Sequence, residues 1–449
     1  MAQRVISRVL QKRFYGAAPA VAKGPAKPVL AAEVLVDKTS NGVSVATQDS
    51  HSSLARVVLA VKAGSRYEEP HQRGAAHCLR VISDLTQKEV RTFRLTRELS
   101  QMAANISVTT SREHIFYTLE VPKDNVGSAL PFLTGMAFSP SFRPWEISDT
   151  MPKMEYELLC LTEQPEKRVV ENAHDVAFRS CGLGRSIYSP VFQMSEFSPD
   201  MLMEYVGKNF TADRVSFSGM GVDRGALLDL VGGLKLQSSS LKNPPAQYFG
   251  GESRESSEQL SAFTVLAGEG ASSTGEDMWA FAALEQLLGS GPQIKWSSNT
   301  TSNRLNAAIS QKTQEPFSVQ SFNVNYSDSG LFGITAVTVP ESSELVIKTA
   351  ADQLKELASK SVDAASLQAA KNRVKATVAF QNECPSDAMV SRAVELLNTG
   401  KLADTTSTMA AIDSVTASAV QNAAKKVLSS RISMASIGEI HNVPYVDQL

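Results

Sequence analysis

The chain has 449 residues, of which 43% are hydrophobic and 20% charged, and this composition is typical of a globular protein with more than one domain. Its 44 basic and 46 acidic residues nearly balance, which argues against a nucleic-acid-binding protein. No run of about 18 uninterrupted apolar residues is present, so we predict no transmembrane segment.

The first 32 residues form a basic leader without a single acid. Arg4, Arg8 and Lys12 recur at every fourth position beside an apolar stripe, a pattern typical of a mitochondrial targeting helix. The run Arg13-Phe14-Tyr15 resembles a matrix cleavage site, which would leave Gly16 as the first mature residue. We therefore predict a presequence over 1–15 and a flexible arm over 16–33. An amphipathic helix that stays in the folded protein is the alternative.

Strand-like and helical patterns then follow in a fixed order. Two strands are predicted at Ser44–Ala46 and Arg56–Val61, and they lead into a helix over Gly74–Leu85. A hairpin, four helices and a closing strand come next; the hairpin is Ile106–Thr109 with His114–Val121, the helices are 125–136, 145–161, 171–179 and 195–208, and the strand is 214–219.

The second half repeats this order. Val121-Pro122, which ends a strand before a helix, recurs 218 residues later as Val339-Pro340. A helix followed by the strand 214–219 recurs at nearly the same spacing before 431–436. This spacing predicts an internal duplication, with domains at 34–231 and 259–449. The Ser-, Pro- and Gly-rich stretch 232–258 is predicted to be an irregular linker. Because strands are followed by several helices in each half, the pattern favours an α+β fold over a doubly wound parallel sheet.

The helix at Gly74–Leu85 carries an incomplete metal motif. A working inverted zinc motif is H-x-x-E-H, in which two histidines four residues apart bind the metal and the glutamate activates water. His77 holds the first position, but Arg80 stands in place of the glutamate and Val81 in place of the second histidine. We therefore predict no catalytic residue and no bound metal here, with His77 hydrogen-bonded near the core and Arg80 exposed or ion-paired. Cys78, Val81, Ile82 and Leu85 would form the buried stripe.

Other candidate residues give weaker signals. A third, acidic metal ligand would come from a later helix, where Glu155 and Glu157 lie, and we predict both on a solvated face. His71, His114 and His174 lack the spacing to join His77 in a metal site. The glycines around 268–270 and 289–291 fit no nucleotide-binding motif, and Gly289 is predicted to end a helix. The four cysteines, at 78, 160, 181 and 384, lie far apart and are predicted to be free thiols.

Two sets of motifs resemble a known family. Gly64–Glu68 and Gly74–Leu79 are similar to the metal-site region of the pitrilysin-like (M16) metallopeptidases. The remaining similarity is to a non-catalytic branch of that family, the core subunits of the mitochondrial cytochrome bc1 complex, and it is carried by Tyr248–Glu252, Gln314–Phe317, Asn325–Gly333, Ala369–Asn372 and Val443–Leu449.

The resemblance implies two related α+β halves, each with a mostly antiparallel sheet and packed helices, that face each other like a clam shell. It implies pairing with core protein 1 and other subunits of the bc1 complex, at the matrix side of the inner membrane and without a membrane span. It also implies a scaffolding role with no haem, iron–sulfur cluster or quinone. The alternatives are the non-catalytic subunit of the mitochondrial processing peptidase, disfavoured because only Gly289 and Gly291 follow Leu288, and an active zinc peptidase.

Overall fold

The computed structural model describes residues 33–50, 52–238, 244–291 and 303–449. The predicted presequence with its cleavage site at Tyr15 and Gly16 lies outside these residues, as does the predicted arm except for Glu33. Residues 34–449 form one compact unit. None of the helices in the described part of the chain is long and apolar enough to cross a membrane.

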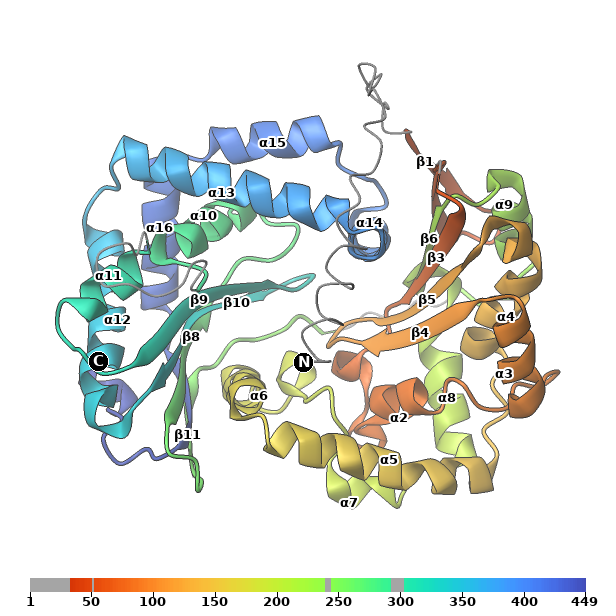
Figure 1. Cartoon of the computed structure of the whole chain (residues 1–449), viewed down its shortest axis with the longest axis horizontal. Helices are drawn as coiled ribbons and strands as arrows, with labels where there is room; N and C mark the ends of the chain where they lie inside the picture. Colours follow the sequence, from red (N-terminus) through yellow and green to blue (C-terminus); the bar gives the residue numbers. More distant parts are fainter. Residues whose placement is uncertain (1–32, 51, 239–243, 292–302) are drawn as a thin grey trace, which may run out of the picture. The chain divides into compact units, whose positions relative to one another are not determined.

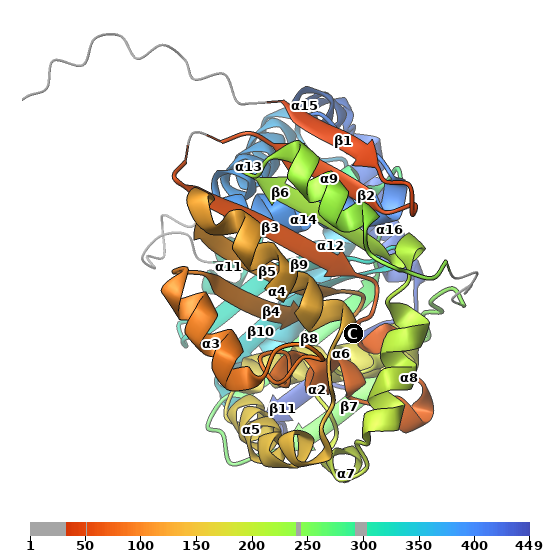
Figure 2. The same ribbon diagram turned by 90° about the vertical axis from the view of Figure 1, so that its right-hand side faces the viewer.

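The first half builds one sheet and its helices (Figures 1 and 2). Its strands are β1 (Val34–Lys38), β2 (Ser44–Gln48), β3 (Leu54–Val61), β4 (Asn105–Thr110), β5 (Ile115–Pro122) and β6 (Val215–Met220). Its helices are α2 (Ala75–Val81), α3 (Thr92–Gln101), α4 (Val126–Phe138), α5 (Pro144–Thr162), α6 (Pro165–Phe178), α7 (Val191–Met194), α8 (Pro199–Asn209) and α9 (Arg224–Gly232).

The second half follows the same plan. Its strands are β7 (Gly251–Ser256), β8 (Ala262–Glu269), β9 (Phe317–Asn325), β10 (Gly330–Thr338) and β11 (Ser433–Gly438). Its helices are α10 (Met278–Leu288), α11 (Arg304–Ser310), α12 (Ser343–Ser359), α13 (Ala364–Glu383), α14 (Pro385–Thr399), α15 (Thr405–Ser414) and α16 (Ala417–Ser429). Short 3₁₀ turns, among them Ser65–Tyr67 and Pro70–Gln72, connect several of these elements.

The two sheets have matching topologies. The first runs β1-β2-β6-β3-β5-β4 and the second β7-β11-β8-β10-β9. In each sheet one parallel pair, β2 with β6 or β7 with β11, stands at one side of a run of antiparallel strands. The strand β1 is an addition at the edge of the first sheet (Figure 2). The predicted α+β duplication with mostly antiparallel sheets is confirmed.

Several elements differ from the prediction. The strand β1 and the helix α3 were not predicted, and α2 ends at Val81 rather than Leu85. The prediction that 232–258 is irregular is wrong at its end, because β7 pairs in parallel with β11 inside this range. The polar sequence Gly251–Ser256 has no apolar alternation, so the strand depends on its neighbour β11 rather than on its own propensity.

One helix of each half packs on the sheet of the other half. The helix α14, from the second half, lies on β2, β3 and β6 of the first sheet (Figure 1). Its fully buried Met389 and Ala393 contact Val58 and Ala60 of β3. The other face of that sheet packs against α2, α4 and α8. Strand β6 is therefore buried along almost its whole length on both faces.

The reciprocal contact is made by α6. Its residues Val169, Ala173 and Ala177, all fully buried, pack with Val265 of β8 and with the strand β11. The opposite face of the second sheet packs against α10, α12 and α16. Each half thus supplies the helix that covers the second face of the partner sheet, so each half alone would expose an apolar sheet surface.

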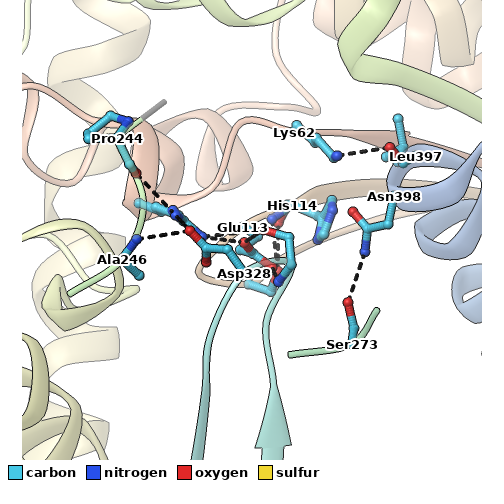
Figure 3. Close-up of polar contacts among 12 residues, drawn as sticks. Lys62, Glu113, His114, Pro244, Ala246, Ser273, Asp328, Leu397 and Asn398 are labelled. Carbon is cyan, nitrogen blue, oxygen red and sulfur yellow. Dashed lines mark hydrogen bonds and ion pairs between the residues drawn. The ribbon is translucent and has the colours of Figure 1, made fainter. Parts of the chain in front are cut away.

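A buried ion pair joins the tips of two equivalent hairpins (Figure 3). The Arg66 guanidinium lies 2.7 Å from a carboxylate oxygen of Glu113 in the β4–β5 turn, and it contacts both carboxylate oxygens of Asp328 in the β9–β10 turn. Glu113 also accepts hydrogen bonds from the backbone N–H and the hydroxyl of Ser327. Because one arginine bridges acids from both halves, removing Arg66 would leave the buried carboxylate of Glu113 without its cation.

A second polar chain connects α6 to the β9–β10 turn. The His174 Nδ1 lies 2.7 Å from the carbonyl oxygen of Val170, and its Nε2 lies 2.8 Å from the hydroxyl of Tyr326. Nδ1 must carry the proton to bond a carbonyl, so Nε2 accepts the Tyr326 O–H. Burial lowers the pKa of His174 to about 3, which keeps the ring neutral.

The helix exchange predicts that a residue of the second half stabilises the first sheet. Met389→Ala should lower the free energy of unfolding by about 2 to 5 kcal/mol, because a fully buried side chain is replaced by a cavity. Urea unfolding followed by circular dichroism measures this. Met203→Ala, at a methionine that is 42% exposed, is the matched control and should cost much less. A loss at Met389 no greater than at Met203 would contradict the packing.

The buried neutral His174 predicts acid lability. An unfolded chain protonates this histidine near pH 6.5 and the folded chain only near pH 3, so stability falls as pH drops through that window. Between pH 7 and pH 5 this contribution is about 2 kcal/mol. Burial raises the pKa of Glu68 to about 7, and that acid contributes with the opposite sign between pH 4.5 and 7. Unfolding of the wild type and of His174→Gln should therefore be compared at both pH values. Equal slopes would refute the assignment.

Candidate functional site

The helix that carries His77 begins at a glycine which no other residue can replace. Gly74 adopts φ +83°, and a Cβ atom there would lie 2.3 Å from the side chain of Ser189. The buried carboxylate of Glu68 accepts the backbone N–H groups of Gly74 at 2.9 Å and Ala76 at 3.0 Å. These bonds satisfy free N–H groups of the first turn of α2 and fix where the helix starts.

Both nitrogens of His77 are engaged. The ring is fully buried, and its Nδ1 accepts the backbone N–H of Ser189 at 3.1 Å. The neutral ring therefore carries its proton on Nε2, which lies 2.7 Å from a carboxylate oxygen of Glu157. Burial lowers the pKa of His77, and the bond to Glu157 opposes this only in part. With both ring positions occupied in this way, His77 presents no free lone pair to a metal ion.

Arg80 binds the same carboxylate. Its two terminal nitrogens contact the two oxygens of Glu157, one of them at 3.3 Å and the other at shorter range. Burial raises the pKa of Glu157, but the hydrogen bonds from Arg80 and His77 outweigh it and hold the pKa below its usual value. The prediction that Arg80 is exposed or ion-paired is therefore confirmed. The prediction of a solvated Glu157 is wrong, while Glu155 is exposed as expected.

The rest of α2 turns to the core as its sequence predicts. Cys78, Val81 and Ile82 are buried, and Leu85 packs partly buried beyond the helix end. Val81 is 2% exposed, so the position of the second histidine is filled by a core residue. The thiol of Cys78 is free, and burial raises its pKa to about 12, which makes it unreactive.

The His77–Arg80–Glu157 cluster adjoins one cavity, and a second cavity lies next to the first. A cavity of about 360 Å³ is lined by Arg80, Glu157 and Cys160, by Tyr188, and by the edge strand β4. The Tyr188 ring also meets the His77 ring edge to face, with centroids 5.5 Å apart. A cavity of about 530 Å³ shares Tyr188 and Lys167 with the first and has strands β9 and β10 as its floor. Of the motif positions, Arg80 thus faces a cavity, together with its partner Glu157.

The other predicted candidates do not join this cluster. His71 is exposed near Glu69, whereas His114 and His174 are buried elsewhere. Gly289 ends α10 at φ +123°, as predicted for a helix terminus. Within the described residues no group of three or more His, Cys, Asp or Glu side chains is placed to hold a metal ion.

Sequence reasoning missed three contributors to the site. Glu68 caps α2 from six residues before it, and an acid just ahead of a helix start is a detectable signal. The backbone N–H of Ser189 and the ring of Tyr188 come from more than a hundred residues downstream. No local pattern marks a backbone donor at such a distance.

The chain resembles known proteins along nearly its whole length. The family model "Insulinase (Peptidase family M16)" matches residues 44–191, and "Peptidase M16 inactive domain" matches 196–374. Human "Cytochrome b-c1 complex subunit 2, mitochondrial" is 34% identical over 92% of this chain and 91% of its own length, and the rat protein of that name is 33% identical over 94% and 93%. An Arabidopsis thaliana "Probable mitochondrial-processing peptidase subunit alpha-1" is 27% identical over 91% of this chain and 82% of its length. A chain of complex III2 from Candida albicans, solved with Inz-5 bound, matches with a TM-score of 0.81 at 17% identity, covering 93% of this chain and 98% of its own, and so supports the fold.

The geometry predicts that restoring the motif residues alone does not restore a metal site. In Arg80→Glu with Val81→His, Nδ1 of His77 still accepts the backbone N–H of Ser189, so the ring keeps its proton on Nε2, the nitrogen that faces Glu157. Position 81 is also 2% exposed in the core. The double variant should therefore retain no more zinc than the wild type in metal analysis after dialysis. About one zinc per chain, lost again when Glu157→Gln is added, would contradict the geometry.

Proposed function

The chain belongs to the M16 peptidase family, and we propose that it is a non-catalytic core subunit of the cytochrome b-c1 complex. The main support for this proposal is the contact between the Arg80 guanidinium and the Glu157 carboxylate, beside a His77 whose two ring nitrogens are both hydrogen-bonded. The permanent cation of Arg80 contacts the acid that would complete a zinc site, so this carboxylate is not available to hold a metal ion that would activate water. The relatives named subunit 2 of that complex are the most similar of those reported above.

The proposal includes a place and partners. The chain would lie peripherally on the matrix side of the mitochondrial inner membrane and bind it through other subunits. Its partners would be core protein 1 and further subunits of the complex. The ranges 34–231 and 259–449 would be two domains in evolutionary origin, although the exchanged helices α6 and α14 make them one structural unit.

The second candidate is the non-catalytic subunit of the mitochondrial processing peptidase. Relatives named as subunit alpha of the mitochondrial-processing peptidase, in Arabidopsis thaliana and Solanum tuberosum, are 25% to 27% identical to this chain, below the subunit 2 relatives. The segment after α10 that would carry a glycine-rich loop continues into 292–302, outside the described residues. Restored presequence cleavage on mixing this chain with a catalytic subunit would favour this candidate.

Two substitutions in α2 test a structural role against a chemical one. His77→Ala removes two hydrogen bonds and should cost about 1 to 3 kcal/mol, with the complex still assembled and its ubiquinol–cytochrome c reductase activity retained. Val81→Asp buries an unpaired carboxylate and should abolish assembly. Native electrophoresis of mitochondria with activity staining measures both.

Two outcomes would count against the proposal. If the wild-type chain migrates apart from the b- and c-type cytochromes, it is not a subunit of their complex. If His77→Ala is folded and assembled but the complex loses its activity, the histidine has a chemical task that a scaffold does not need.

A further inference from the structure

Two exposed aromatic side chains lie at the starts of neighbouring helices. Phe93, in the first turn of α3, is 79% exposed, and Trp145, in the first turn of α5, is 60% exposed. The hydroxyl of Thr86 ties these helix starts together, because it bonds both Thr92 and Glu146, the residues adjacent to the two aromatics. Figures 1 and 2 both show α3 beside α5. The two rings thus belong to one surface.

Arginines surround this surface. Arg91, Arg94 and Arg97 are exposed on or just before α3, and Lys88 is exposed in the preceding loop. Arg94 pairs with Glu98, whereas Arg91, Arg97 and Lys88 have no ion-pair partner among the residues that the structure describes. The guanidinium of Arg143 lies 5.6 Å from the Trp145 ring centroid.

The local charge runs against that of the rest of the chain. The segments 86–98 and 143–149 together contain five basic residues and four acids, and of these acids Glu98 pairs with Arg94 and Glu146 accepts the hydroxyl of Thr86. Outside the leader the chain has 38 basic and 46 acidic residues, since six of the 44 bases lie in residues 1–32. A basic and aromatic surface on an otherwise acidic molecule therefore indicates a specific use rather than general solubility.

We propose that the surface formed by Lys88, Arg91, Phe93, Arg97, Arg143 and Trp145 binds an acidic protein partner within the assembled complex. Phe and Trp would fill apolar hollows of that partner, and the arginines would pair with its carboxylates. This inference rests on the proposed function, because it places the partner among the other subunits.

The side chains favour a protein over a lipid surface. Three of the four basic residues in this surface are arginines, whose planar fork binds carboxylates through two parallel hydrogen bonds. Lysine, which is present once in this surface, binds a diffuse anionic membrane surface as well as arginine does. Large aromatics together with arginine are the side chains that dominate binding energy at protein interfaces. Leaving a phenylalanine largely in water forgoes the apolar burial that such a partner would provide.

The test uses the assembled complex, purified from mitochondria through a tag on a cytochrome subunit. Phe93→Ala with Trp145→Ala removes the anchors, and Arg91→Glu with Arg97→Glu reverses the charge. Phe380→Ala is the matched control, because Phe380 is 67% exposed on α13, in the other half. All five substituted residues are exposed, so an unchanged Tm confirms that each variant folds.

Quantitative mass spectrometry of the purified complexes gives the readout. Both double variants should lose the same neighbouring subunit by about tenfold or more after a salt wash, with Phe380→Ala retaining it. A photo-reactive phenylalanine analogue at position 93 should cross-link in the wild-type complex to a peptide that contains Asp or Glu. Wild-type subunit ratios in both double variants, or loss of the same subunit in Phe380→Ala, would overturn the proposal.

Two further arms separate the remaining outcomes. Purified chain is mixed with vesicles of neutral lipid or of neutral lipid with about one-fifth anionic lipid. Binding to the anionic vesicles that both double variants lose would overturn the protein partner in favour of a membrane. If the wild-type chain is absent from the purified complex, the proposed function fails and this inference fails with it. If the wild-type chain is present in the purified complex but both double variants retain every subunit, the proposed function stands and only this inference fails.

Discussion

The exchange of α6 and α14 between the halves is the constraint on which the rest of the structure depends. Each sheet has a central strand, β6 or β11, that is buried along nearly its whole length, and such a strand needs helices on both faces. Each half provides the helices for one face only. The second face is covered by Met389 and Ala393 in one sheet and by Val169, Ala173 and Ala177 in the other. Neither half therefore has a complete core without the other.

The same exchange holds the altered metal site in place. Glu157 lies on α5, and only two residues separate the end of α5 from the start of α6, which is anchored in the second sheet. His77 is fixed from the first half through Glu68 and Ser189. The distance between His77 and Glu157 is thus set by packing that no metal ion is needed to maintain. This explains how the contact between His77 and Glu157 is held by protein groups alone.

The duplication could be predicted because the same local sequence patterns occur in both halves of the chain. A strand that ends in Val-Pro before a helix is recognisable wherever it occurs, and the hairpin β4–β5 shows clear alternation. The helix α3 was missed because most of its residues are polar or charged and only Leu95 within it is buried, although the helix is amphipathic. The role of Glu157 was missed for a different reason. The sequence shows an acid among other acids on α5, and only the fold brings that one acid against Arg80 and His77. The exchange of helices also cannot be predicted from the local sequence, because the apolar stripe of a helix does not indicate which sheet it will pack against.

The arginine at residue 80 suits the electrostatics of the Glu157 carboxylate. Without a cation beside it Glu157, whose side chain is only 24% exposed, would keep an uncompensated negative charge. Leaving such a group unpaired costs several kcal/mol where it is partly shielded from water. Neutral residues at position 80 offer no compensation, and a glutamate would add a second negative charge. An arginine supplies a permanent positive charge and two parallel donors at the carboxylate, so it stabilises the fold at the position where the peptidase glutamate would destabilise it.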